Sequence, residues 1–493
     1  MLAAAVWAPA RSAHAQTTQP AAQQPTQEKA GPTSPRPGSG AGPQQPFTIV
    51  RWNEDYTYLR TAPDADLWDP LKYIPLNDAG DWYLSLGAQA RYRYEWFDNF
   101  NFGAPGQQDD NGYHLGRILA HADAHFGPNV RAFLQLISAG VDGREPTERP
   151  IDENDFDYHQ AFADLRLPID EDNGVALLLR GGRQNLAYGA QRFISPLDWT
   201  NVRRTFDGGK ASLALSKTHT LDAFYVNPVV VDEGPLDKAN DDDFAGVYDT
   251  MGLPNVLEGA GSKLELYALY LDKETGVFAA GAGEEQRYTL GVRFSTAPKP
   301  WDFDVEADYQ FGDFADGDVS AWSFATEAGY TFAEATFAPR VYLGFDAASG
   351  DDDPADGDLE TFNQLFPLAH PYFGFIDLIG RQNIIDIKPG VELTLAQEKR
   401  HVKRLALRAD YYWFWRQSDA DALYGTAGNI QRASGGSDET YVGSELDLLL
   451  NWQIDRHLAA YFGYSHFFAG DFIEETGPDD DIDFVYGALV YTF

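Results

Sequence analysis

The stretch of sequence that decides the fold is WDFDVEADYQF, residues 301–311. Apolar and polar residues alternate along it, which is the two-residue period of a β-strand. One face would present Trp301, Phe303, Val305, Ala307, Tyr309 and Phe311, and the other Asp302, Asp304, Glu306, Asp308 and Gln310. A soluble β-sandwich cannot bury such an acidic face. A membrane barrel can hold this strand, because its aromatic face meets lipid while its carboxylates point into a wet lumen.

Three other segments, residues 82–97, 286–296 and 401–416, show the same period. Their expected lipid-facing rows are Leu84, Leu86, Ala88, Ala90, Tyr92, Tyr94 and Trp96; Tyr288, Leu290, Val292 and Phe294; and Leu405, Leu407, Ala409, Tyr411, Trp413 and Trp415. Tyr and Trp at the ends of such rows are typical of the aromatic belts of membrane barrels. In residues 174–184 no face can be assigned, because Leu177, Leu178 and Leu179 are consecutive.

Segments of strand length recur along the whole chain after residue 82. They lie near residues 82–97, 113–126, 129–138, 158–168, 174–186, 204–216, 219–228, 262–272, 286–296, 301–313, 319–332, 338–347, 383–397, 401–416, 441–454, 456–469 and 483–493. Bacterial single-chain barrels favour even strand numbers, so one strand is missing from these seventeen and we predict an all-β, antiparallel transmembrane barrel of eighteen. A barrel of that width is a channel or a plugged channel.

The connections between these segments differ in length. We expect long ones, such as residues 231–260, 348–382 and 417–440, on the extracellular side and short turns on the periplasmic side. The composition agrees with a barrel, because no stretch of eighteen uncharged apolar residues follows the N-terminus to form a membrane helix. Cysteine is absent, while 32 Phe and 26 Tyr can supply aromatic girdles.

The two ends of the chain point to the bacterial outer membrane. Residues 1–15 end in Ala13-His14-Ala15, a signal-peptidase pattern, and are interpreted as a signal peptide whose start is truncated. Residues 16–46 are rich in Gln, Pro, Thr and Gly, which predicts a disordered leader. Residues 47–81 are then a periplasmic N-terminal segment and residues 82–493 the barrel. The last strand alternates in polarity and stops on Phe493, which resembles the signal by which bacterial barrels are recognised for insertion.

The formal net charge of −38 lies largely in acidic runs such as Asp241–Asp243, Asp351–Asp353 and Asp479–Asp481. Solvated extracellular loops explain these runs. The acidic stretch 351–358 offers oxygen ligands of the kind that calcium uses, but it lacks the spacing of an EF-hand, so a metal site stays open. No nucleotide-binding glycine pattern is present, and no cofactor is expected.

The expected lumen-facing rows contain most of the positive charge of the strands. They include Arg91, Arg93, Arg117, Arg131, Arg287, Arg293, Arg340, Lys388, Arg404, Arg408 and Arg416. Rings of Arg would favour an anionic solute, because a guanidinium group matches a carboxylate. Acidic residues, among them Glu306, Asp308, Asp386, Asp410, Glu445 and Asp447, face the same lumen. A lumen in which these charges neutralise each other across strands is the alternative.

Several segments resemble the alginate-export porins. They are GGRQNLAYGAQRFISPLDWTNVRRTFDG at residues 181–208, YFGFIDLIGRQNI at 372–384, DYYWFWR at 410–416 and YVGSELDLLL at 441–450. The resemblance runs from about residue 80 to the end. It implies an eighteen-stranded barrel that secretes the polyuronate alginate through an Arg-rich constriction gated by loops.

The resemblance also implies particular pore residues. Arg91 matches a basic residue of the first strand, Arg183 lies in the Gly-Arg-Gln motif, and Arg381 precedes a later strand where the family places pore arginines; Arg117 matches more loosely. Glu306 could keep these side chains apart. The chain departs from the family at Gln160 and Ala161, and at Tyr461 and Phe462, where basic residues are expected.

The sequence therefore predicts an outer-membrane channel that exports an anionic, alginate-like polysaccharide, with lipid and periplasmic secretion components as partners and no nucleic acid. An uptake porin for small sugars or anions, with an inward-folded loop, is the alternative. An enzyme is not expected, because the candidates for a catalytic group are only loosely arranged. They are Ser212, Ser216, His219 and Asp222 near a turn, and Asp198 beside Trp199.

Overall fold

The computed structural model describes residues 47–62, 66–106, 111–145, 149–231, 236–254, 256, 261–296, 300–399 and 402–493. The predicted signal peptide, residues 1–15, and the predicted leader, residues 16–46, lie outside these ranges. No helix among the described residues is long and apolar enough to cross a membrane.

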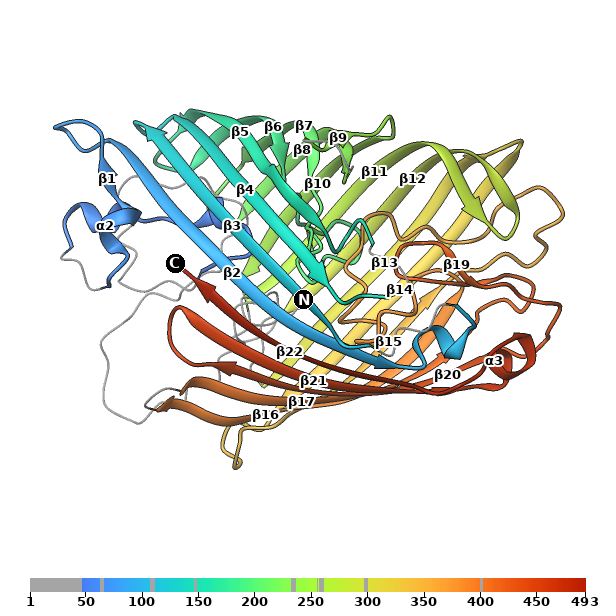
Figure 1. Ribbon diagram of the computed structural model, residues 1–493. Coiled ribbons are helices and arrows are strands. Elements are labelled where there is room, and N and C mark those ends of the chain that lie inside the picture. Colours follow the sequence, from blue (N-terminus) through green and yellow to red (C-terminus); the bar gives the residue numbers. More distant parts are fainter. Residues whose placement is uncertain are drawn as a thin grey trace.

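In this part of the chain, eighteen long antiparallel strands form a closed barrel (Figure 1). Each strand pairs with the next one along the chain, and the last pairs with the first, so the barrel has no free edge. This confirms the predicted fold. The strands are β2 (Trp82–Asp98), β3 (Tyr113–Phe126), β4 (Val130–Asp142), β5 (Asn154–Asp170), β6 (Val175–Gln184), β7 (Phe206–Ala214), β8 (His219–Val230), β10 (Asp243–Pro254), β11 (Gly261–Phe278), β12 (Gly281–Thr296), β13 (Trp301–Phe314), β14 (Gly317–Thr331), β15 (Arg340–Ala348), β16 (Ile384–Lys399), β17 (Val402–Trp415), β20 (Tyr441–Gln453), β21 (Leu458–Ala469) and β22 (Ile482–Thr492).

Shorter elements lie at the ends of the barrel. Before β2 come η1 (Arg51–Asn53), η2 (Thr57–Arg60), α2 (Asp69–Lys72) and β1 (Ile74–Pro75). The connections contain η3 (Phe100–Gly103), β9 (Lys238–Ala239), β18 (Leu423–Tyr424), β19 (Ile430–Arg432) and α3 (Asp471–Thr476).

The strand missing from the sequence-based count is β10. The prediction of one long connection over residues 231–260 is wrong, because β10 crosses the wall between β8 and β11. Its polarity does not alternate as in the other strands. Phe244 and Tyr248 are buried on the inner side, whereas Asp249 lies on the outer side with Val247. A search for apolar-out and polar-in residues therefore passes over it.

The strand faces follow the predicted alternation. In β13 the exposed fractions of Trp301 and Tyr309 are 52% and 48%, while those of Asp302 and Glu306 are 1% and 3%. The ambiguous run in β6 is also resolved, since Leu178 is buried on the inner side and Leu179 is exposed on the outer side. The wall therefore has an apolar outer surface and a polar inner surface, as a lipid bilayer around a wet lumen requires.

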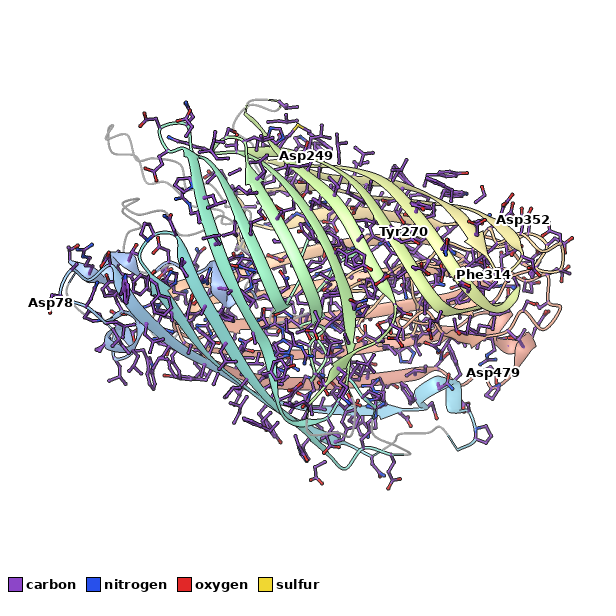
Figure 2. The ribbon with its side chains drawn as sticks, turned by 90° about the horizontal axis from the view of Figure 1, so that it is seen from above. Asp78, Asp249, Tyr270, Phe314, Asp352 and Asp479 are labelled. Carbon is purple, nitrogen blue, oxygen red and sulfur yellow. The ribbon has the colours of Figure 1, made fainter. Side chains whose placement is uncertain are left out.

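The two ends of the barrel differ in their connections. Short turns join the strands at the end where β2 begins and β22 stops, and the long connections 185–205, 349–383 and 416–440 leave the opposite end. Figure 2 shows Asp78 at the first end and Asp352 and Asp479 at the other. Short turns face the periplasm in outer-membrane barrels, which orients the molecule.

The N-terminal segment enters the periplasmic mouth of the barrel. Trp52 of η1 packs edge-on against the ring of Phe162, and the Arg180 guanidinium lies 3.7 Å from the centre of the Trp52 ring. Arg131 donates a hydrogen bond of 2.6 Å to the Trp52 carbonyl. Because these partners belong to the inner face of β4, β5 and β6, this part of the predicted periplasmic segment lies inside the lumen.

Candidate functional site

Two of the long connections fold into the lumen instead of extending into solvent. Residues 185–205, between β6 and β7, form the first inner loop, and residues 349–383, between β15 and β16, form the second. Their buried apolar residues are Leu186, Tyr188, Phe193, Ile194, Trp199, Val202, Leu359, Phe362, Leu368, Phe373, Phe375, Ile376, Leu378 and Ile379. The connection expected over 348–382 does leave the extracellular end of the barrel, but most of it is buried in the lumen.

Backbone hydrogen bonds join the two inner loops. Ile194 and Phe366 lie opposite each other in a short parallel bridge. The amide of Ser195 donates to the Phe366 carbonyl over 3.0 Å, and the amide of Phe366 donates to the Phe193 carbonyl over 2.9 Å. The two loops thus meet within the lumen as one structural unit.

An aromatic stack lies beside this junction. The His370 ring stacks on Trp199 of the first inner loop at 3.8 Å and on Phe375 at 4.7 Å. Nδ1 of His370 lies 2.9 Å from an Asp377 carboxylate oxygen. Burial outweighs Asp377 and lowers the pKa of His370 to about 4, so the ring is neutral at pH 7.

Arginines of β2 and β3 hold the tip of the first inner loop, residues 198–200. Arg91 donates to the carbonyls of Asp198, Trp199 and Thr200 over 2.9, 3.1 and 2.6 Å. Arg117, its cross-strand neighbour, donates to the Asp198 and Thr200 carbonyls over 3.2 and 3.1 Å. Arg93 donates to the Trp199 carbonyl and lies 4.0 Å from the centre of the Trp199 ring.

The charges around this tip do not balance. Arg93 pairs with Glu95, and both Arg117 and Arg203 pair with Asp198. Burial raises the pKa of Asp198, but Arg117 and Arg203 outweigh that effect and hold it at about 2, so Asp198 is ionised. Within the described residues no carboxylate lies at ion-pair distance from Arg91, whose acceptors are three carbonyls and the Asn201 side chain. Four arginines thus share two carboxylates.

The other predicted pore residues face the interior with carboxylate partners. Arg183 pairs with Asp157 and Asp207, Arg287 with Glu285, Arg293 with Glu265 and Asp304, Arg404 with Glu392, and Arg408 with Asp410; Glu306 pairs with Arg192. Arg381 belongs to the second inner loop and pairs with Asp346. For these residues the structure shows the alternative that the sequence analysis gave, in which positive and negative charges of the lumen neutralise each other. Arg91, Arg93 and Arg117 meet at one place; Arg183 and Arg381 belong to separate ion pairs.

A carboxylate wall holds the second inner loop. Asp447 accepts a hydrogen bond of 3.1 Å from the Phe375 amide, and Glu445 accepts one of 3.0 Å from the Ile376 amide. Both acids come from β20, and Asp410 lies directly across from Asp447 on β17. One wall of the lumen thus binds loop carbonyls through arginines, and another binds loop amides through carboxyl oxygens.

Sequence reasoning missed the loop residues of this site, chiefly Arg192, Asn201, Arg203 and His370, and named Trp199 only as the neighbour of Asp198. The Asn201 side-chain amide donates to the carbonyls of Gly116, Gly140 and Asp152 over 3.0, 3.1 and 2.8 Å, which fixes the first inner loop to the wall. The apolar content of the two connections could have revealed them. The connections 185–205 and 349–383 contain too many large apolar side chains to lie in water.

The loose enzyme candidates do not come together. Ser212 and Asp222 are buried on the inner face as cross-strand partners, whereas His219 points outward and pairs with Asp249 at 2.7 Å. Around the acidic stretch 351–358, and elsewhere in the described part of the chain, no group of three or more acidic or histidine side chains is arranged to hold a metal ion.

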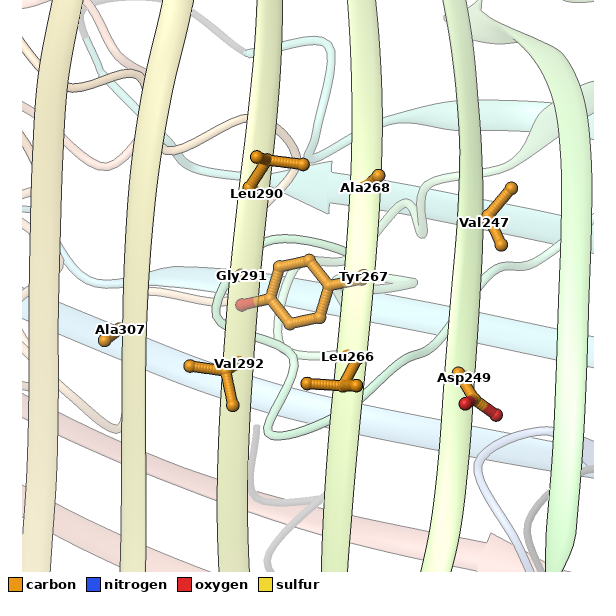
Figure 3. Close-up of a pocket in the computed structure, with 9 residues that line it drawn as sticks. All are labelled: Val247, Asp249, Leu266, Tyr267, Ala268, Leu290, Gly291, Val292 and Ala307. Atoms are coloured by element: carbon orange, nitrogen blue, oxygen red, sulfur yellow. The ribbon is translucent and has the colours of Figure 1, made fainter.

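A shallow hollow of about 460 Å³ lies on the outer wall at β10–β13 (Figure 3). It exists because Ala268 and Ala307 are small among the lipid-facing Val247, Leu266, Leu290 and Val292. The Tyr267 side chain, behind the hollow, points into the lumen, where its hydroxyl donates to Glu306 over 2.8 Å. The hollow is therefore part of the lipid-facing surface and not of the channel.

A comparison of the sequence with protein families gives a match that spans the barrel. The model of the family described as alginate export matches residues 82–486. The chain belongs to the alginate-export family. Residues 181–208 and 372–384, which suggested this family, form parts of β6, the two inner loops and the start of β7 and β16.

Solved structures show the same fold. OccK1 (OpdK) of Pseudomonas aeruginosa has 10% identical residues and a TM-score of 0.56, over 83% of this chain and 98% of that chain. OccK8 (OprE) of the same organism has 13% identity and a TM-score of 0.53 over the same shares. No curated protein matches the sequence. Family and fold are those of outer-membrane channels, and the chain is a bacterial outer-membrane protein.

Proposed function

We propose that this channel exports an anionic polysaccharide of the alginate type, and that the polymer passes where the two inner loops now meet. The observation that carries the proposal is the set of neutral acceptors around Arg91. An ionised carboxylate offers a guanidinium group an opposite charge and two parallel hydrogen bonds, which a neutral carbonyl does not. Uronate groups can therefore replace the loop carbonyls of residues 198–200.

This exchange gives the polymer a way to open its own path. The first inner loop loses its anchors on Arg91 and Arg117 when a carboxylate takes them, and the surplus of positive charge there favours the anion. The mixed charges farther along the lumen prevent tight retention, because arginines such as Arg183, Arg287 and Arg293 already have acidic partners there. Transport requires release as well as binding.

An uptake porin for small sugars or anions is the second candidate. The inner loops favour it, because they fold into the lumen and occupy part of the path. OpdK of Pseudomonas aeruginosa, whose fold matches this chain with a TM-score of 0.54, has been solved with vanillate. That neighbour is 10% identical and supports the fold alone.

Planar-bilayer recordings distinguish the two candidates. We expect polyuronate to cause frequent brief blocks of the current in the native barrel, whereas a neutral glucan of equal length causes none. Replacing Arg91 and Arg117 together by Gln should shift the selectivity from anions toward cations and reduce the blocking frequency about tenfold. Lys403→Gln, a change at an exposed site near a periplasmic turn, is the matched control. Small uronate monomers that permeate while the polymer neither blocks nor passes would favour the uptake porin.

A further inference from the structure

Residues 47–54 lie inside the lumen on its periplasmic side, and we call them the plug; η1 lies within it. Trp52, at its centre, is 6% exposed and packs with Phe133 and Phe162 of the inner wall. The Trp52 carbonyl accepts a hydrogen bond of 2.6 Å from Arg131 of β4. The plug therefore covers this part of the wall through both its ring and its backbone.

The wall behind Trp52 has three cations at one level of the barrel. Arg131, Asp164, Arg180 and Lys210 are successive cross-strand neighbours on β4, β5, β6 and β7. The three cationic groups lie 6.0, 3.7 and 5.7 Å from the centre of the Trp52 ring, in the same order. We call Arg131, Arg180 and Lys210 the entry pocket. An aromatic ring thus occupies a place that three positive charges surround.

The entry pocket suits a flat ring that has a carboxylate. The Arg180 guanidinium lies between the rings of Trp52 and Phe162, 3.7 Å from the centre of each. Its Nη1 has no hydrogen-bond acceptor in the described part of the chain, although Arg180 is only 4% exposed. An indole attracts cations through its quadrupole alone, whereas a carboxylate has a full charge and accepts two parallel hydrogen bonds. A uronate ring is therefore a better ligand for this pocket than Trp52 is.

Acidic partners keep the affinity of the entry pocket moderate. Arg131 pairs with Asp123 at 2.6 Å, Arg180 with Asp164 at 2.7 Å, and Lys210 with Asp222 at 3.3 Å. A uronate there would meet donors that are already partly used, so it binds without being trapped. A path for a polymer requires such release.

The plug is loosely satisfied and is linked to the first inner loop. The Trp52 indole N–H is buried without an acceptor among the described residues, which costs free energy in the docked state. Arg203 of the first inner loop donates to the Ile49 carbonyl over 3.1 Å and pairs with Asp198 at 3.1 Å. A movement of the plug therefore changes the contacts of the loop tip.

We propose that the entry pocket binds a uronate residue of the cargo and that the plug occupies it, through Trp52, until the cargo arrives from the periplasm. The inference rests on the proposed export of an anionic polysaccharide. The uronate ring replaces the indole beside Arg180, and its carboxylate replaces the Trp52 carbonyl on Arg131. The displaced plug then releases Arg203, which loosens the first inner loop.

The test follows the plug by electron paramagnetic resonance in the full-length barrel. The chain has no cysteine and Asn53 of η1 is exposed, so a nitroxide on Asn53→Cys reports the mobility of the plug. We expect a short oligouronate to make this label mobile and a neutral glucan of equal length to leave it immobile. The same label on Lys403→Cys, an exposed site near a periplasmic turn, is the matched control.

Variants of the entry pocket make the test specific. Arg180→Gln together with Asp164→Asn removes one ion pair as a unit, so no lone buried charge remains. We expect this variant to need about tenfold more oligouronate for the same change in mobility. If it does not fold, Lys210→Gln with Asp222→Asn serves for the same comparison.

Two results would overturn the inference. The first is an immobile label at oligouronate concentrations that block the current, which would leave the proposed export intact. The second is an equal response to the neutral glucan, because the pocket would then not select a carboxylate. A label that oligouronate makes mobile, in barrels that pass no polyuronate, would support the entry pocket and contradict the proposed export.

Discussion

At the scale of single residues, two inward-facing arginines of similar burial differ in the charge of their partners. Arg183 lies between Asp157 and Asp207, with its side chain 3% exposed. Arg91 is bonded only to neutral groups. Removing one partner of a buried ion pair leaves an uncompensated charge, which costs far more than losing bonds to neutral carbonyls.

We therefore expect Arg183→Gln to lower the free energy of unfolding by about 3 kcal/mol or more. Arg91→Gln should lower it by about 1–2 kcal/mol and chiefly change channel behaviour. Unfolding in urea, followed by the heat-modifiable shift of the folded barrel on a gel, measures both. Equal losses in the two variants would mean that the Arg183 ion pairs contribute no more than the loop contacts of Arg91.

At the scale of elements, the strands follow directly from the sequence. The outer face of β13 shows why, because Val305 and its apolar neighbours alternate with buried acids. We expect Val305→Arg to destabilise folding into bilayers by about 2–4 kcal/mol, since this face meets lipid. Val305→Ala is the size control. Equal folding yields of the two variants in a urea titration with liposomes would show that this face does not contact lipid.

The inner loops depend on a neutral His370. The charged groups that face its ring are Asp377 and Arg93, and Tyr486 packs edge-on against it. The folded pKa of about 4 lies below the ordinary value of 6.5. The neutral His370 therefore contributes its full stabilisation of the docked loop above pH 6.5. That contribution, about 3 kcal/mol, is lost as the pH falls from 6.5 toward 4.

We predict from this that acid loosens the inner loops. Single-channel recordings should show larger and more frequent openings at pH 4.5 than at pH 7. His370→Phe keeps the stack on Trp199 without a titrating group, so its openings should change little over the same range. An equal rise in both proteins would assign the acid response to the carboxylate wall instead.

For the whole molecule, the two-residue period accounts for the barrel and for seventeen of its strands, and the even number of strands in bacterial barrels gives the eighteenth. The period does not account for β10, whose inner side chains Phe244 and Tyr248 are as apolar as its outer ones. It also gives no information on loops, because a connection has no period. Trp199 and His370 are ordinary residues in sequence, and they become a site only because both loops turn into the lumen.

The absence of cysteine makes the central claim, that cargo passes by parting the inner loops, directly testable. Ile194 and Phe366 lie opposite each other in the bridge between the loops, at the spacing of neighbouring strands, which suits a disulfide. The measurement is polyuronate passage through barrels with Ile194→Cys and Phe366→Cys, oxidised and then reduced. We predict that the oxidised barrel stays folded but passes no polymer, and that reduction restores passage. Undiminished passage through the oxidised barrel, with both single-cysteine variants unaffected, would contradict the account.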